Sequence, residues 1–197
     1  FRELLEASYH NSNLIHLSAG SSVPLLKNTL WIVVRGMVKL SSISPQGDEL
    51  LLGLVGPNEP LGDPLSQVEA YEARTLIESD LLCFSCEAIR QDPLLAAGLL
   101  QAVAQRHRQS EAMLALLGLR RIEDRVRGFL ELLATSYGQP CDQGLRLAMK
   151  LTHQDIASAL STTRVTVTRI LGTLRDEGWL QLDNQRHLVV SFLPTRS

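Results

Sequence analysis

The chain has 197 residues, of which 45% are hydrophobic and 20% are charged, and its formal net charge at pH 7 is -2. These values fit one large or two small globular domains, and no apolar run reaches the ~18 residues of a membrane span. A secretory signal pattern is also lacking, so we expect a cytoplasmic protein without membrane attachment. Only three cysteines are present (Cys83, Cys86 and Cys141), which is too few and too uneven for a disulfide scaffold.

The first 90 residues are predicted to form short β-strands. Residues 30–40 are rich in β-branched side chains and are interrupted by Gly36, and residues 41–54 read as two strands around a Pro-Gln-Gly-Asp turn. Residues 55–64 hold three Pro and two Gly and are expected to be loop, and residues 75–84 form another strand. Short strands with regular turns favour an antiparallel sandwich or roll.

Helical periodicity begins near Asp92 and continues to about Ser136. Along this helix, a line of residues recurs at alternating spacings of four and three positions. Such a line predicts a seam along which two copies of the chain pair, although the same helix could instead pack on its own β domain. The line consists of Leu99, Val103, Arg106, Ser110, Met113 and Leu117. A charge on this line needs a partner, and Glu69, Glu72 and Glu111 are the candidates for Arg106.

Two further segments suggest where the chain divides. Residues 120–127 (RRIEDRVR) have alternating charges, typical of a solvated helix face or a hinge, and residues 137–144 (YGQPCDQG) are expected to be a turn-rich linker at a domain boundary. We therefore predict a sensor domain at 1–91, a dimerisation helix at 92–119, and a hinge with a DNA-binding domain at 120–197.

Residues 151–174 (LTHQDIASALSTTRVTVTRILGTL) predict two helices joined by a tight turn. Thr152 can cap the first helix, with Asp155 completing an imperfect capping box, and Thr163 can cap the second. Helical spacing then divides the second helix into two faces. We expect Val167, Ile170, Leu171 and Leu174 to be buried, and Arg164, Val165, Thr168 and Arg169 to be exposed.

The second helix has the character of a DNA-reading helix. Arg can donate two hydrogen bonds to guanine, and Val can contact the methyl group of thymine, so Arg164 and Val165 suit base recognition. The alternative is an amphipathic helix with two solvated Arg side chains. Residues 179–182 and 187–190 alternate as strands around residues 183–186, which predicts a wing. Residues 141–197 hold seven Lys or Arg and five Asp or Glu, a local excess that phosphate binding requires.

On these residues, and most specifically on THQDIASALSTTRVTVTRILGTLRDEG (152–178), the chain resembles the CRP/FNR family of bacterial regulators. Its Arg164-Val165 pair is more similar to the NtcA-type nitrogen regulators of cyanobacteria than to CRP itself. The resemblance implies an α+β fold with an N-terminal antiparallel β-roll of the cyclic-nucleotide-binding type, a long dimerisation helix and a C-terminal winged helix-turn-helix. It also implies a homodimer that binds a GTA…TAC palindrome in double-stranded DNA and contacts RNA polymerase as an activator.

The resemblance also places the residues that contact DNA. They are Thr152, His153, Thr162, Thr163, Arg164, Val165, Thr168 and Arg169, with His153 expected on a backbone phosphate. In the turn, the family usually has Gly where this chain has Ser161. If that residue is left-handed, the strain is about 1–2 kcal/mol.

In the family, an effector binds in the β-roll and is closed in by the long helix. The matching residues here are Gly62, Asp63, Tyr71, Glu72, Arg74, Arg106, Ser110 and Glu111. Tyr71-Glu72 replaces the Arg-Ser pair that holds the cyclic nucleotide phosphate, so cAMP is not expected. For 2-oxoglutarate, Glu69 stands where the nitrogen regulators have Arg and disfavours a dicarboxylate, although Arg74 could move into the site. A structural ion pair of Arg106 is the alternative to any anionic ligand.

Three other functions are weighed against this one. Cys83 and Cys86 form a CxxC pattern, but residues three apart face opposite sides of a strand, so we expect structural cysteines and no metal site. An enzyme on a β-roll needs clustered metal ligands, and residues 25–90 contain no His, so we expect no enzyme. The remaining alternative is a redox- or small-molecule-sensing module that acts through protein contacts and binds DNA weakly.

Overall fold

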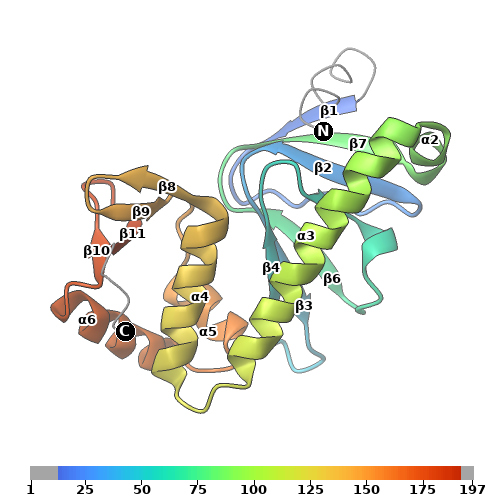
Figure 1. The fold of residues 1–197 in the computed structure, drawn as a ribbon. Helices are drawn as coiled ribbons and strands as arrows, with labels where there is room; N and C mark the ends of the chain where they lie inside the picture. Colours follow the sequence, from blue (N-terminus) through green and yellow to red (C-terminus); the bar gives the residue numbers. More distant parts are fainter. Residues whose placement is uncertain (1–12, 192–197) are drawn as a thin grey trace. The chain divides into compact units, whose positions relative to one another are not determined.

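Short antiparallel β-strands build the N-terminal part of the protein. The structure, a computed structural model, describes residues 13–191. Two antiparallel sheets, ordered β1-β7-β2-β5 and β4-β3-β6, confirm the predicted β-structure (Figure 1). Their strands are β1 (Asn13–Leu17), β2 (Thr29–Arg35), β3 (Val38–Ile43), β4 (Glu49–Val55), β5 (Pro60–Leu61), β6 (Tyr71–Thr75) and β7 (Ser79–Ser85). The expected loop at 55–64 contains the short β5 and enters a 3-10 turn, η1 (Asp63–Leu65).

Gly36 makes the predicted break between β2 and β3. Its φ of 104° is strained for residues with a side chain, and a Cβ there would lie 2.6 Å from the backbone oxygen of Glu78. The turn therefore needs both the conformational freedom and the small size of glycine.

The two faces of β2 bury different cores. Trp31 and Val33 point between the two sheets, where they pack with Leu40 and Leu81. The intervening residues of β2 point to the opposite face and pack with side chains from two helices, α2 (Cys86–Gln91) and α3 (Pro93–Leu117). This second cluster consists of Leu30, Ile32, Leu82, Phe84, Ile89, Leu95 and Leu99, with Val103 against it.

Two of the six residues of the predicted dimer seam pack in or against the second cluster. Leu99 is 8% exposed and Val103 packs beside it, so both belong to the core of their own chain and not to a surface that faces a second copy. For these two residues the seam prediction is wrong, whereas Arg106, Ser110, Met113 and Leu117 remain predicted seam residues.

The chain divides into two compact units between Ser110 and Glu111. The second unit contains α4 (Ile122–Tyr137), β8 (Gly138–Cys141), β9 (Gly144–Leu147), α5 (His153–Ala159), α6 (Arg164–Asp176), β10 (Leu180–Leu182) and β11 (Leu188–Ser191). Its strands form one sheet, ordered β10-β11-β9-β8. The helical periodicity predicted over 92–136 corresponds to two helices, α3 and α4, which residues 118–121 separate.

The predicted linker at 137–144 is wrong. These residues begin the β8–β9 hairpin, which contacts α4 and pairs with β11. Gly144 permits this pairing, because a Cβ at that position would collide with the carbonyl of Val190.

No helix in the described part of the chain is long and apolar enough to cross a membrane.

Candidate nucleic-acid interface

The first helix of the reading motif, α5, begins with the expected cap. The Thr152 hydroxyl accepts a hydrogen bond from the backbone N–H of Asp155 at 3.0 Å, and the Asp155 carboxylate accepts one from the backbone N–H of Thr152 at 2.9 Å. This is a complete capping box, so Asp serves here in the place that Glu more often takes. The start of α5 is thereby fixed.

The turn after α5 contains a residue in the left-handed conformation, at the position where the family usually has Gly. Ser161 has φ 51°, and the backbone N–H of Thr162 donates to the Ala157 carbonyl at 3.0 Å. This bond closes a Schellman turn, in which glycine is the usual left-handed residue. Arg125 of α4 also donates to the Leu160 carbonyl, at 3.4 Å. Side-chain and backbone donors therefore satisfy the end of α5 despite the strain at Ser161.

The second helix, α6, has the two faces that its spacing predicts. Thr163 caps its first turn by accepting from the backbone N–H of Thr166. The four residues expected to be buried are 5% exposed or less, namely Val167, Ile170, Leu171 and Leu174. On the other face, Arg164, Thr168 and Arg169 are exposed, and Val165 is 79% exposed. An isolated large apolar side chain at this exposure, next to an Arg, is well placed for contact with bases.

Thr168 and His153 link the two helices. The Thr168 hydroxyl donates to the Arg164 carbonyl at 2.9 Å, so it accepts a hydrogen bond from Nδ1 of His153 at 2.7 Å. Burial, followed by the charges of Arg164 and Arg175, lowers the pKa of His153 below its ordinary 6.5. His153 therefore holds the two helices together, and Thr168 presents its methyl group rather than a free hydroxyl.

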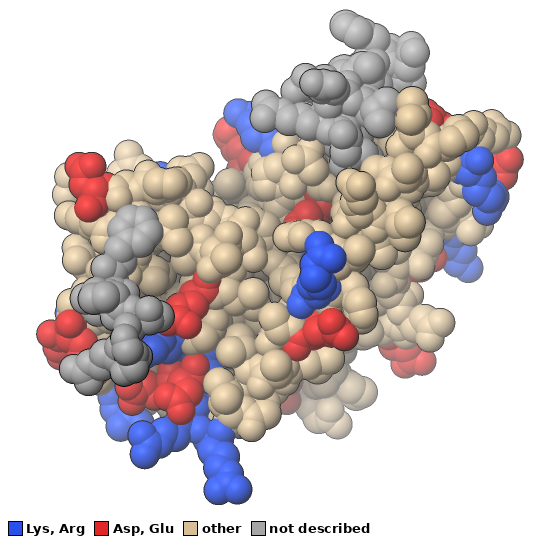
Figure 2. Space-filling model, viewed as in Figure 1, with Lys and Arg blue, Asp and Glu red and all other residues tan. Residues whose placement is uncertain are grey.

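Basic side chains gather beside α6. Figure 2 shows a group of them at the lower left, below the position of α6 in Figure 1, with acidic side chains set above the group. Arg164, Arg169 and Arg175 lie on this helix and are all exposed. A concentrated positive surface next to the reading helix can bind the phosphates that flank a major groove.

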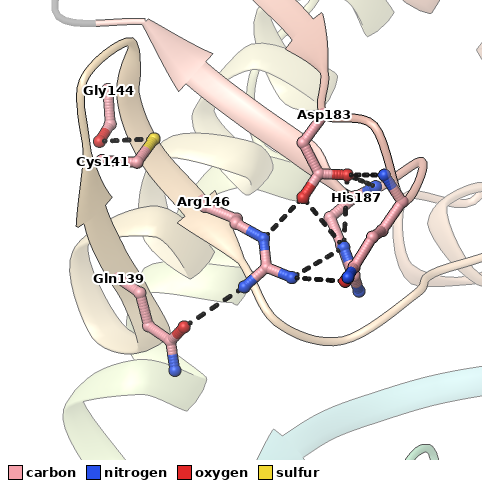
Figure 3. A network of polar contacts seen from close by, with 7 residues as sticks. Gln139, Cys141, Gly144, Arg146, Asp183 and His187 are labelled. Carbon is pink, nitrogen blue, oxygen red and sulfur yellow. Dashed lines mark hydrogen bonds and ion pairs between the residues drawn. The ribbon is translucent and has the colours of Figure 1, made fainter.

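A polar network fixes the base of the wing (Figure 3). Arg146 of β9 donates from Nε to Asp183 at 2.6 Å, and its Nη2 lies 2.9 Å from Nδ1 of His187. Asp183 also accepts from the backbone N–H groups of Gln185 and His187, at 2.8 and 2.7 Å. The loop between β10 and β11 is therefore held from both of its ends and from the neighbouring strand.

These contacts decide the charge of Asp183. Its partial desolvation would raise the pKa, but hydrogen bonds from the His187 backbone and the Arg146 guanidinium outweigh it and hold the pKa well below 3.8. An ionised carboxylate therefore organises a turn in which Arg186 is exposed with φ 65°.

The N-terminal unit contains a cavity of about 390 Å³ at the expected effector position. Tyr71, Arg106 and Ser110 line it as predicted, but the other expected residues do not, namely Gly62, Asp63, Glu72, Arg74 and Glu111. Glu72 and Arg74 point outward because they alternate with inward-facing Tyr71 and Ala73 on β6. Arg74 instead donates to the Gly20 carbonyl at 3.0 Å.

The predicted ion pair of Arg106 is absent among the described residues. Its Nη1 donates to the Leu54 carbonyl at 2.6 Å and contacts the side-chain oxygen of Gln109 at 3.5 Å, and both of these acceptors are neutral. Most of the cavity wall was missed, because it is aliphatic and resembles ordinary core in the sequence. The wing residues Asn184, Gln185 and Arg186 were recognised as a turn but not as a surface that could face DNA.

The two cysteines of the CxxC pattern lie on successive elements. Cys83 lies half-buried on β7, and Cys86 is the first residue of α2. Between residues 13 and 191, no group of His, Cys, Asp and Glu side chains is arranged to hold a metal ion.

A capped helix pair with an exposed Arg-Val start, followed by a wing, defines a winged helix-turn-helix protein that binds DNA. Residues 124–192 match the family described as the Crp-like helix-turn-helix domain. The regulatory protein CysR of Synechococcus elongatus is 32% identical over 176 residues, which cover 88% of this chain and 81% of CysR. The global nitrogen regulator of Synechocystis sp. is 33% identical over 167 residues, covering 80% of this chain and 74% of that regulator.

The fold points in the same direction. A CRP-family transcriptional regulator of Thermus thermophilus, TTHB099, superposes with a TM-score of 0.74 at 22% identity, covering 90% of this chain and 92% of that one. The chain belongs to the CRP/FNR family of transcription regulators and is similar to its nitrogen-regulator members. The predicted α+β fold is confirmed. The relatives are regulators and not enzymes, which agrees with the expectation of no catalytic activity.

Proposed function

We propose that the chain acts as a homodimer that binds a GTA…TAC palindrome and regulates transcription through contact with RNA polymerase, as an activator. The observation that carries the DNA-reading part is the exposed start of α6, where Arg164 and Val165 stand opposite a fully buried face. Arg164 is suited to guanine, and Val165 to the methyl group of thymine. Because bacterial DNA lies in the cytoplasm, we place the protein there.

Phosphate contacts would set the position of the reading helix. His153 at the start of α5, Thr152, Thr162, Thr163 and Arg169 are candidates for this role, since helix N-termini and exposed Arg side chains bind phosphate oxygens. Thr168 contributes a methyl group, because its hydroxyl is already bonded to the Arg164 carbonyl.

A second line on α3 supports dimerisation better than the predicted seam. Leu100 and Leu114 are 71% and 68% exposed, and His107, midway between them, is exposed as well. Their spacing of seven places them on one face of the helix, where large apolar side chains favour pairing with a second copy. Two recognition helices would then enter successive major grooves, about 34 Å apart.

Fluorescence anisotropy of the purified chain tests the proposal, using the palindrome and a scrambled duplex of equal length at one fixed salt concentration. Salt is held constant because phosphate-driven affinity falls steeply as it rises. We expect a preference for the palindrome of about 10³-fold or more. Equal affinity for both duplexes would contradict specific reading by Arg164 and Val165, and would favour a module that acts through protein contacts.

A further inference from the structure

The cavity in the N-terminal unit has mostly apolar walls and one permanently charged side chain. Seven of its twelve lining residues are aliphatic or proline, including Leu40, Leu52 and Leu61 on the strands and Val103 on α3. Arg106 is its one permanently charged residue, and the lining contains no Asp or Glu. The volume of about 390 Å³ is within the range of small-molecule sites.

Arg106 is held in place but is not neutralised. Its Nη1 and Nη2 lie 3.6 and 3.8 Å from the position that a Cβ of Gly53 would take, so the guanidinium rests against bare backbone. Both of its hydrogen bonds to described residues come from Nη1 and go to neutral oxygens, at Leu54 and Gln109. The remaining N–H groups of Arg106 can therefore meet an anion, and a guanidinium binds a carboxylate through two parallel hydrogen bonds.

Hydroxyl groups and the imidazole of His107 are the other polar features of the wall. Burial raises the pKa of Tyr71, and the positive charge of Arg106 and a hydrogen bond with the backbone of Gly62 offset only part of this rise. Ser66 adds a second hydroxyl, whereas the Ser110 hydroxyl already donates to the Arg106 carbonyl at 3.1 Å. The Tyr71 and Ser66 hydroxyls can hydrogen-bond a carboxylate that Arg106 holds, but being neutral they cannot balance a second negative charge.

We infer that the cavity binds a small monocarboxylic acid with an aromatic or branched aliphatic body, its carboxylate on Arg106 and its body against the leucines. A second carboxylate, as in 2-oxoglutarate, would lie among the Leu, Val and Pro side chains that make up most of the wall, away from Arg106. A cyclic nucleotide would place its ribose hydroxyls against the same apolar wall. Regulation of DNA binding by this ligand would rest on the function proposed above. Binding of the ligand to the cavity does not depend on that function.

Isothermal titration calorimetry of the full chain without DNA tests the inference. The probes are 1-naphthylacetate and 4-methylpentanoate, with the uncharged 1-naphthylacetamide, 2-oxoglutarate and cAMP for comparison. We expect a carboxylate to bind at least about tenfold more tightly than its amide, and Arg106→Gln to remove that difference. Arg108→Gln is the matched control, because Arg108 is exposed on the same helix and bonds only to Gln105 among the described residues.

A second pair of variants avoids the core. Val68 is 45% exposed on the loop that walls the cavity, so Val68→Asp should fold normally and weaken the carboxylate, whereas the neutral Val68→Asn should weaken it much less. The inference would be overturned if 1-naphthylacetamide bound as tightly as 1-naphthylacetate, or if 2-oxoglutarate or cAMP bound and the monocarboxylates did not. It would also be overturned if neither monocarboxylate bound at about 1 mM. Anisotropy on the palindrome, measured separately, reports failure of the proposed DNA function while the titrations stand.

Discussion

Arg164 and Arg169 are both exposed on α6, but they should affect DNA binding differently. Five residues place them about 140° apart around the helix, so they cannot meet the same part of the duplex. Arg164→Ala should cost about 1–3 kcal/mol of the preference for the palindrome, and Arg169→Ala should weaken both duplexes alike and reduce the salt slope by about one. Anisotropy titrations at several salt concentrations distinguish these effects. An equal loss on both duplexes for Arg164→Ala would exclude it from base reading.

Ser161 shows how a local preference can yield to the motif around it. The left-handed conformation costs a non-glycine residue about 1–2 kcal/mol, while glycine adds up to about 1 kcal/mol of entropy to the unfolded chain. Ser161→Gly should therefore stabilise the chain by up to about 1 kcal/mol, seen as a higher urea midpoint with an unchanged slope. Ser158→Gly, inside α5, is the control and should destabilise. A lower midpoint for Ser161→Gly would mean that its side chain contributes more than the strain costs.

His153 makes DNA affinity depend on pH. Its pKa lies below 6.5 in the free protein, and a nearby phosphate raises it, so binding takes up a proton at pH values between the two pKa values. Affinity should then fall as pH rises through that window, and His153→Gln should flatten the profile. Anisotropy between about pH 5.5 and 8 at fixed salt measures this. A profile for the variant that keeps the original slope would assign the pH dependence to another group.

At the scale of elements, the wing depends on one carboxylate. The pKa of Asp183 is lower in the folded chain than in the unfolded chain, so the folded state binds fewer protons between the two values. Its contribution to stability is complete above about pH 4 and is lost as pH falls through the folded pKa. Asp183→Asn should therefore lower stability at pH 7 and weaken the acid dependence, as measured by urea unfolding at a series of pH values. Asp142→Asn, exposed between β8 and β9, is the control.

The elements that the sequence predicted well are those that a local pattern defines. The cap at Thr152, the four buried residues of α6 and the break at Gly36 all depend on neighbours within a few residues. The β8–β9 hairpin was taken for a linker because Gly138, Pro140 and Gly144 resemble loop residues, and its pairing with β11 joins segments more than 40 residues apart. The aliphatic cavity wall gave no signal, since in a sequence it cannot be distinguished from core.

At the scale of the whole molecule, α3 has two apolar lines and the sequence could not assign them. Leu99 and Val103 pack on the sheet of their own chain, and the exposed Leu100 and Leu114 are the residues that we propose to pair with a second copy. Leu114→Glu should therefore convert a dimer to a monomer in light scattering, with a large loss of palindrome affinity. Leu94→Glu is the control, since Leu94 is 65% exposed on another side of α3. A dimer that survives Leu114→Glu would place the interface elsewhere.

The strand order of the C-terminal unit has a consequence for how the protein is made. β11 is the last strand in the described chain, yet it lies between β10 and β9 and joins them. Until residues 188–191 have left the ribosome, β9 lacks this partner and the buried side chains of Val189 and Val190 are missing from the core. Because a small domain folds cooperatively, the nascent chain cannot complete its DNA-reading unit before that point. A message truncated shortly before the codon for Leu188 would therefore yield a product that retains every residue of α6 but binds no palindrome.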